Sequence, residues 1–128
     1  MLKRFTGPRS GRPYSSAVRA GNLVHTAGYT GFDKDGQVPD DFVDQCRLIF
    51  EKARMNLERA GSSLAEVVSV NVYLTDQDRD RDALDSAFRE VFAAAPPART
   101  TVEIKGLSSP EKRVEMQFVG YASREASE

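Results

Sequence analysis

The chain has 128 residues, of which 40% are hydrophobic and 29% charged, and its 18 basic and 19 acidic residues leave a net charge of -1. This composition predicts one soluble globular domain over residues 1–128, with no general attraction for nucleic acid or an anionic membrane. No apolar run approaches the roughly 20 residues that span a bilayer, and no signal-peptide stretch opens the chain. The single cysteine, Cys46, fits a reducing cytoplasm, where we expect the protein.

The first half of the chain predicts an irregular lead-in, two short strands and one helix. Gly and Pro recur in the first dozen residues, and strands are expected over residues 15–19 and 23–29. Over residues 41–60, apolar side chains recur at three- and four-residue steps, which predicts a helix with one apolar face. An aspartate at 40 or 41 suits its N-cap, and Gly61 suits its end.

The second half begins with a predicted central strand and a second helix. Residues 67–74 are dense in β-branched and aromatic side chains, as in a strand buried within a sheet. A helix is expected over residues 79–94, ended by the Pro96-Pro97 pair. The charged run at residues 76–82 is interpreted as the solvated start of this helix. The side chains expected to face inward are Leu84, Ala87, Phe88, Val91 and Phe92.

Residues 96–120 predict two adjacent strands joined by a short polar loop. Successive side chains of a strand point to opposite faces, so Arg99 and Thr101 should share the polar face of the first strand. In the second strand, alternate apolar residues face the core and leave Glu115 on the opposite face. If the apolar faces of both strands meet one core, Arg99 and Glu115 project from the same side of the sheet.

These elements together predict an α+β fold of two layers, with two helices on one face of a mixed sheet. The other face would carry residues such as Val67, Tyr73 and Val119, which are too apolar to be left to water. A homo-oligomer that packs these faces around a shared axis is the simplest remedy.

Arg99 is the strongest candidate for function, because a guanidinium can bind a carboxylate through two parallel hydrogen bonds. The alternative is an ion pair with Glu103 or Glu115 that only holds the strand. Glu115 itself could position or deprotonate a water molecule, or could be an ordinary strand carboxylate paired with Lys105 or Arg113.

Three further residues have side chains that could bind a ligand or take part in catalysis, and each also has a simpler structural explanation. Tyr14 could form a hydrogen bond to a ligand through its hydroxyl, or its ring could simply fill space at the start of a strand. His25 is the only histidine, which with the absence of CxxC and HxxxH spacings argues against a protein-built metal site or a histidine-based triad. Cys46 falls on the apolar face of the first helix, where a buried hydrophobe is expected.

Four segments resemble the RidA family, also called the YjgF or reactive-intermediate deaminase family. They are RPYSSAVRAGNLVHTAG at residues 12–28, LERAGSSLAEVVSVNVYLTD at 57–76, PPARTTVEI at 96–104 and RVEMQFVG at 113–120. The segments follow the order and spacing of the family over nearly the whole chain after the first dozen residues. The proline-alanine-arginine segment is the most specific of them, and it favours a ligand site at the arginine.

The resemblance implies a chorismate-mutase-like fold and a barrel-like homotrimer with ligand clefts between subunits. It implies an enamine/imine deaminase, a hydrolase acting on C–N bonds that converts 2-aminoacrylate-type intermediates to 2-keto acids and ammonia without a cofactor. Carried over by position, Arg99 would bind the substrate carboxylate, Glu115 would orient the attacking water, and Tyr14 would line the cleft. Because an imine carbon is already electrophilic, positioning and electrostatics suffice, and no nucleophilic side chain is needed.

The sequence departs from the family pattern at several positions. Tyr29 stands where many members have glutamine, and its bulk is expected to narrow or reshape the substrate cleft. Thr101 replaces a frequent cysteine, Asp85 a common asparagine and Gln117 the usual second glutamate of the last strand. These changes leave the arginine in place, so carboxylate binding is expected to survive, but they leave the identity of the substrate open.

Two other functions compete with the deaminase. The departures are compatible with a non-catalytic trimeric binder or sensor of small keto or amino acids. A ribonuclease activity has been attributed to some relatives. The slight excess of acidic over basic residues and the lack of a pair of catalytic histidines argue against it here.

Overall fold

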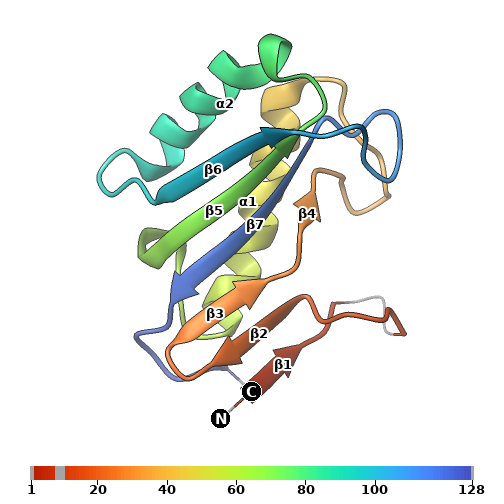
Figure 1. The fold of residues 1–128 in the computed structure, drawn as a ribbon. Helices are drawn as coiled ribbons and strands as arrows, with labels where there is room; N and C mark the ends of the chain where they lie inside the picture. Colours follow the sequence, from red (N-terminus) through yellow and green to blue (C-terminus); the bar gives the residue numbers. More distant parts are fainter. Residues whose placement is uncertain (1, 8–10, 128) are drawn as a thin grey trace.

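The computed structural model describes residues 2–7 and 11–127. These residues fold into a seven-stranded sheet with both α-helices packed on one of its faces (Figure 1). The strands are β1 (Leu2–Phe5), β2 (Ala17–Ala20), β3 (Leu23–Thr26), β4 (Tyr29–Thr30), β5 (Val67–Leu74), β6 (Ala98–Glu103) and β7 (Val114–Tyr121). The helices are α1 (Phe42–Arg59), α2 (Gln77–Phe92) and the 3-10 turn η1 (Leu64–Glu66). The predicted two-layer α+β fold is confirmed.

The strand order is β1-β2-β3-β7-β5-β6, and β4 pairs with β7 beside the end of β3. Among the strand pairs in the described part of the chain, only β5 and β6 run parallel, because α2 carries the chain back along the helical face between them. The prediction that the last two strands are adjacent is wrong, since β5 lies between β6 and β7 (Figure 1).

Both long helices form where the apolar spacing predicts them. Helix α1 starts after Asp41, whose side chain accepts a hydrogen bond from the backbone N–H of Asp44 at 3.2 Å. It ends at Arg59, and Gly61 just beyond its C-cap has a φ of 93°, a conformation that glycine adopts without strain. Helix α2 starts two residues before the expected position, with Asp76 as its N-cap, and ends at Phe92, before the proline pair. Its predicted inward residue Val91 is instead exposed.

The N-terminal region is more regular than predicted. Strand β1 pairs with β2 and buries Phe5. The predicted strand over residues 23–29 is two strands, β3 and β4, separated at Ala27 and Gly28. Across this break the Thr26 hydroxyl accepts a hydrogen bond from the N–H of Phe118, so that side chain replaces part of the strand ladder.

An aromatic cluster fills the space between the helices and the sheet. The ring of Phe50 on α1 lies 5.6 Å from that of Phe88, 5.7 Å from that of Phe92 and 6.3 Å from that of Phe118. Cys46 is fully buried in this layer, as expected, and burial raises the pKa of its thiol to about 12.

None of the helices among the described residues covers the other face of the sheet (Figure 1). Val119 and Tyr73 on this face are half-buried, and Tyr121 and Val102 are exposed. Val67, which was expected there, instead belongs to the core, because a bulge between Val67 and Ser69 shifts its register. Within residues 2–7 and 11–127, no helix is long and apolar enough to cross a bilayer.

Candidate active site

Arg99 points to the helical face of the sheet. The strand register pairs Arg99 with Val70 and pairs Val70 with the core residue Phe118, so all three side chains share that face. The prediction that Arg99 and Glu115 project from the same side is therefore wrong. Its premise fails because β6 is an edge strand whose apolar residue, Val102, faces solvent rather than the core.

Asp85 of α2 is the partner of Arg99. The Nη2 of Arg99 donates to Oδ1 of Asp85 at 2.6 Å, and its guanidinium lies 4.7 Å from the centre of the Phe88 ring. The side chains remain 25% and 31% exposed, respectively. The expected partner Glu103 instead accepts the backbone N–H of Gln77 at the start of α2, at 2.8 Å.

A hollow of about 340 Å³ adjoins this ion pair. Apolar side chains of the last turns of α2 and the following proline pair form most of its wall, and the Arg99–Asp85 pair and Arg89 supply its charge. The lining residues are Asp85, Phe88, Arg89, Phe92, Ala93, Pro96, Pro97 and Arg99. A cation beside an apolar hollow is suited to a small carboxylate with an apolar substituent.

Glu115 lies on the other face of the sheet, where β7 places it opposite Tyr73 of β5 and Thr30 of β4. Its carboxyl group packs directly against Gly28. A Cβ atom added to that glycine would lie 2.8 Å from the carboxyl carbon of Glu115, so no larger residue fits there without moving this side chain. No residue in the described ranges forms a hydrogen bond or ion pair with the Glu115 side chain. An expected partner, Arg113, binds Asp80 instead.

The other predicted site residues lie in different places. Thr101 is half-buried on the same face as Arg99, two residues along β6. Tyr14 is 55% exposed, and its hydroxyl accepts a hydrogen bond from Arg12 at 3.1 Å. Tyr29 is only 5% exposed in the single chain, packs against Phe118, and donates its hydroxyl to the carbonyl of Ser16 at 2.7 Å, so its influence on a cleft between copies stays a prediction. This burial raises the pKa of Tyr29 well above its usual value.

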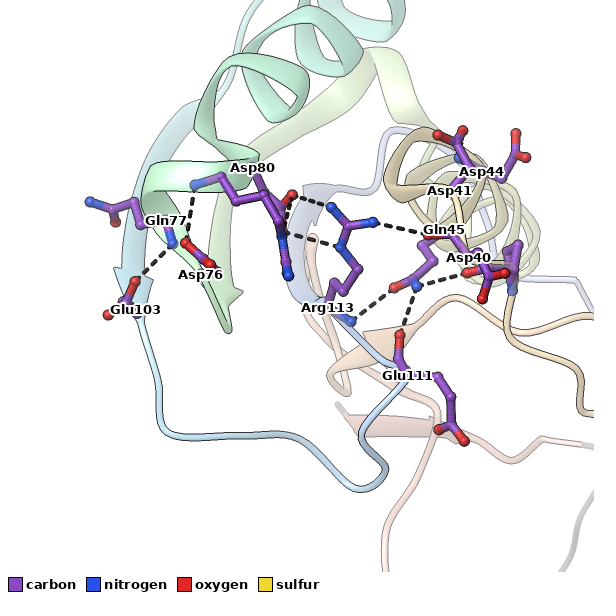
Figure 2. A network of polar contacts seen from close by, with 12 residues as sticks. Asp40, Asp41, Asp44, Gln45, Asp76, Gln77, Asp80, Glu103, Glu111 and Arg113 are labelled. Atoms are coloured by element: carbon purple, nitrogen blue, oxygen red, sulfur yellow. Dashed lines mark hydrogen bonds and ion pairs between the residues drawn. The ribbon is translucent and has the colours of Figure 1, made fainter.

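A buried polar network, which the sequence analysis missed, lies at the start of α2 (Figure 2). The Asp80 side chain is only 2% exposed and forms ion pairs with Arg79 and Arg113. Burial by itself would raise the pKa of Asp80, but the hydrogen bonds from Arg79 and Arg113 outweigh it and hold that pKa below its usual value. The expectation that residues 76–82 are solvated is therefore wrong for Asp80.

Gln45 of α1 extends the same network to the loop that precedes β7 (Figure 2). Its amide nitrogen donates to the carbonyls of Pro39 and Glu111, both at 2.9 Å, and its amide oxygen accepts the N–H of Arg113 at 2.9 Å. The signal that could have revealed Asp80 was its spacing, since it lies four residues before the inward-facing Leu84.

Comparison with known proteins places this architecture in a family. The family model described as "Endoribonuclease L-PSP" matches residues 6–122. The chain belongs to the RidA/YjgF family. A member of the YjgF/YER057c/UK114 family from Mycobacterium tuberculosis, known from its crystal structure, is 31% identical, with a TM-score of 0.83 over 94% of this chain and 99% of that one.

Among the relatives of this chain, two have names that indicate an activity. A RutC family protein of Pyrococcus horikoshii is 36% identical over 89% of this chain and 90% of its own. A 3-aminoacrylate deaminase of Acinetobacter baylyi is 31% identical over 85% of this chain and 86% of its own. A 2-iminobutanoate/2-iminopropanoate deaminase of Dermatophagoides farinae is 29% identical over 84% of both chains. These names support deamination as the general class of activity in the RidA family.

Three departures from the RidA pattern now have positions in the structure. Asp85 forms the ion pair with Arg99, Tyr29 is part of the core, and Gln117 donates its amide N–H to the carbonyl of Thr26 at 3.2 Å. Only Asp85 therefore changes the charge beside the candidate substrate-binding arginine. In residues 2–7 and 11–127, no group of three or more His, Cys, Asp or Glu side chains is placed to hold a metal ion.

Proposed function

We propose that the protein is an enamine/imine deaminase that hydrolyses 2-aminoacrylate-type intermediates to 2-keto acids and ammonia. The observation that carries this proposal is the partly exposed guanidinium of Arg99 beside an apolar hollow. A guanidinium has five N–H donors, and in the described ranges Asp85 is its one hydrogen-bonded partner, so donors remain for a carboxylate.

The reaction needs only a bound imine and a positioned water. An enamine first moves a proton to its β-carbon and becomes the imine. The water oxygen then forms a bond to the imine carbon as the nitrogen takes up a proton, which gives a neutral carbinolamine. A second proton on the nitrogen makes it a leaving group, and the C–N bond breaks as the hydroxyl loses its proton, so ammonia leaves and the keto acid remains. In this proposal Arg99 holds the substrate carboxylate, and Glu115 accepts a hydrogen bond from the water and takes its proton.

Arg99 and Glu115 lie on opposite faces of one sheet, so a site that contains both needs two copies of the chain. We therefore propose a homotrimer in which the Arg99 hollow of one copy meets Glu115 of the next, with Tyr14 and Thr101 at the edges of the cleft. The exposed apolar side chains Val102 and Tyr121 support this assembly, because packing against another copy would remove them from water.

Formation of 2-keto acid from an imine, generated in the assay by an amino-acid oxidase or dehydratase, tests the proposal. Wild-type protein should accelerate it, and Arg99→Ala should lower that acceleration at least about 100-fold, because it removes the charge-assisted bonds to substrate. Arg81→Ala is the matched control, since Arg81 is an exposed arginine of α2 that does not line the hollow. Undiminished activity in folded Arg99→Ala would reject the proposal.

The second candidate is a non-catalytic binder of keto or amino acids. The specific observation in its favour is that Asp85 already neutralises much of the charge of Arg99, which weakens the electrostatic help available to a reaction. Saturable binding of 2-oxobutanoate with no acceleration of imine decay by the wild-type protein would favour this candidate over the deaminase.

A further inference from the structure

Asp85 places a hydrogen-bond acceptor beside the position that a ligand of Arg99 would occupy. Its Oδ1 lies 2.6 Å from the Nη2 of Arg99, and both side chains border the hollow and are partly exposed. In the described residues Asp85 has no other hydrogen bond, so its second oxygen can accept one from a ligand.

We propose that Asp85 is a specificity-determining residue that makes the Arg99 site prefer a 2-imino or 2-amino acid over the 2-keto acid of the same skeleton. This inference rests on the proposed function of Arg99 as the carboxylate-binding group. A carboxylate can only accept hydrogen bonds, the imine or amine nitrogen carries N–H groups that donate, and a keto oxygen can only accept. The nitrogen of the substrate can therefore bond Asp85, whereas the oxygen of the product is repelled by it.

The two ligands also differ in what they must displace. An imino acid can insert between the paired side chains, with its carboxylate on Arg99 and its nitrogen on Asp85, so both charged groups keep a partner. A keto acid whose carboxylate takes the Nη2 donor of Arg99 leaves Asp85 without a donor, which is costly for a partly buried charge. The site thus binds the substrate and releases the product after the nitrogen has left.

The rest of the hollow is compatible with either ligand and so leaves the discrimination to Asp85. The rings of Phe88 and Phe92 and the proline pair contact an apolar substituent of any 2-substituted acid. With Asp85 counted, Arg89 and Arg99 leave the lining with one net positive charge, so anionic ligands are still attracted.

Equilibrium binding of two stable probes tests the proposal in the full-length protein. The probes are 2-aminobutanoate and 2-oxobutanoate, which share a carbon skeleton and differ in N–H against C=O. We expect wild type to prefer the amino acid by about ten-fold or more, the amount that one hydrogen bond to a charged group supplies. Asp85→Asn should remove this preference, mainly by binding 2-oxobutanoate more tightly, because an amide can donate to the keto oxygen and releases Arg99. Asp85→Ser, which also removes the charge, should do the same.

Asp82→Asn is the matched control, because it removes an exposed negative charge of α2 that does not line the hollow, and it should keep the wild-type preference. No preference in wild type, or an unchanged preference in Asp85→Asn and Asp85→Ser, overturns the role of Asp85. The Arg99→Ala protein separates this failure from that of the proposed function. If Arg99→Ala no longer binds either probe, Arg99 is still supported as the carboxylate-binding residue. If Arg99→Ala binds both probes as wild type does, the carboxylate site and the role of Asp85 are both overturned.

Discussion

Helix α2 carries two aspartates that each pair with an arginine from elsewhere in the chain, and their surroundings differ. Asp80 is 2% exposed and is bonded by Arg79 and Arg113 in a network that joins both helices to the start of β7. Asp85 is 31% exposed, has Arg99 as its partner and borders a hollow.

The difference shows what makes an ion pair structural and what leaves it available to a ligand. Both carboxylate oxygens of the buried Asp80 accept hydrogen bonds from Arg79 and Arg113, so a small molecule that displaced these arginines would leave a charge unpaired in the interior. The Arg99–Asp85 pair is reached by solvent and can exchange partners at low cost. Substitutions in one region, with the other region as the reference, test this difference.

Asp80→Ala should have the largest effect on stability, about 3–5 kcal/mol, because it leaves the half-buried Arg113 without its charged partner. Denaturant unfolding at fixed protein concentration measures this loss. Asp82→Ala, an exposed position on the same helix, should change stability by less than about 0.5 kcal/mol. Equal effects of the two variants would mean that the network does not hold the fold.

Gly31→Ala should lower the free energy of unfolding by about 1–3 kcal/mol. The added Cβ would lie 2.7 Å from the Cα of Gln45, and this overlap would push α1 away from β4. Gly28→Ala meets only the end of the flexible Glu115 side chain, so its stability should change less while keto-acid formation falls as that carboxylate moves. Thermal unfolding and the activity assay on both variants test this contrast. It fails if Gly28→Ala is the less stable protein or keeps full activity.

Acid should weaken the Asp80 region in a defined direction. The folded-state pKa of Asp80 is lowered, so its contribution to stability is complete above the unfolded value of about 3.9 and is lost as the pH falls below it through the folded pKa. A single group adds at most about 1.4 kcal/mol per pH unit to the slope of the unfolding free energy. Wild type should therefore lose stability more steeply below about pH 4 than Asp80→Asn, and parallel curves would contradict the lowered pKa.

Asp85→Ala should have the smallest effect on stability, about 1 kcal/mol or less, since the pair is partly solvated. Denaturant unfolding measures it beside Asp80→Ala. A loss as large as that of Asp80→Ala would place both pairs in the same structural class and remove the distinction on which the candidate site depends.

Local patterns predicted the elements well, and non-local pairing decided what they could not. The spacing of apolar residues located α1 and the composition located β5, because both signals lie within one element. The face of Arg99 was predicted wrongly, because it depends on β5 entering the sheet between β6 and β7, which no local pattern encodes. Asp80 was hidden for a related reason: its partner Arg113 lies 33 residues away.

The central claim, that Arg99 exchanges its partner for a carboxylate ligand while Arg113 does not, can be tested by NMR of the arginine Nε–H groups. The Arg99 signal, assigned with Arg99→Lys, and the Arg113 signal would be followed as 2-aminobutanoate or 2-oxobutanoate is added to the full-length protein. We predict that the Arg99 signal shifts saturably with either ligand and that the Arg113 signal stays in place. An unmoved Arg99 signal, or an equal shift at Arg113, would contradict the account.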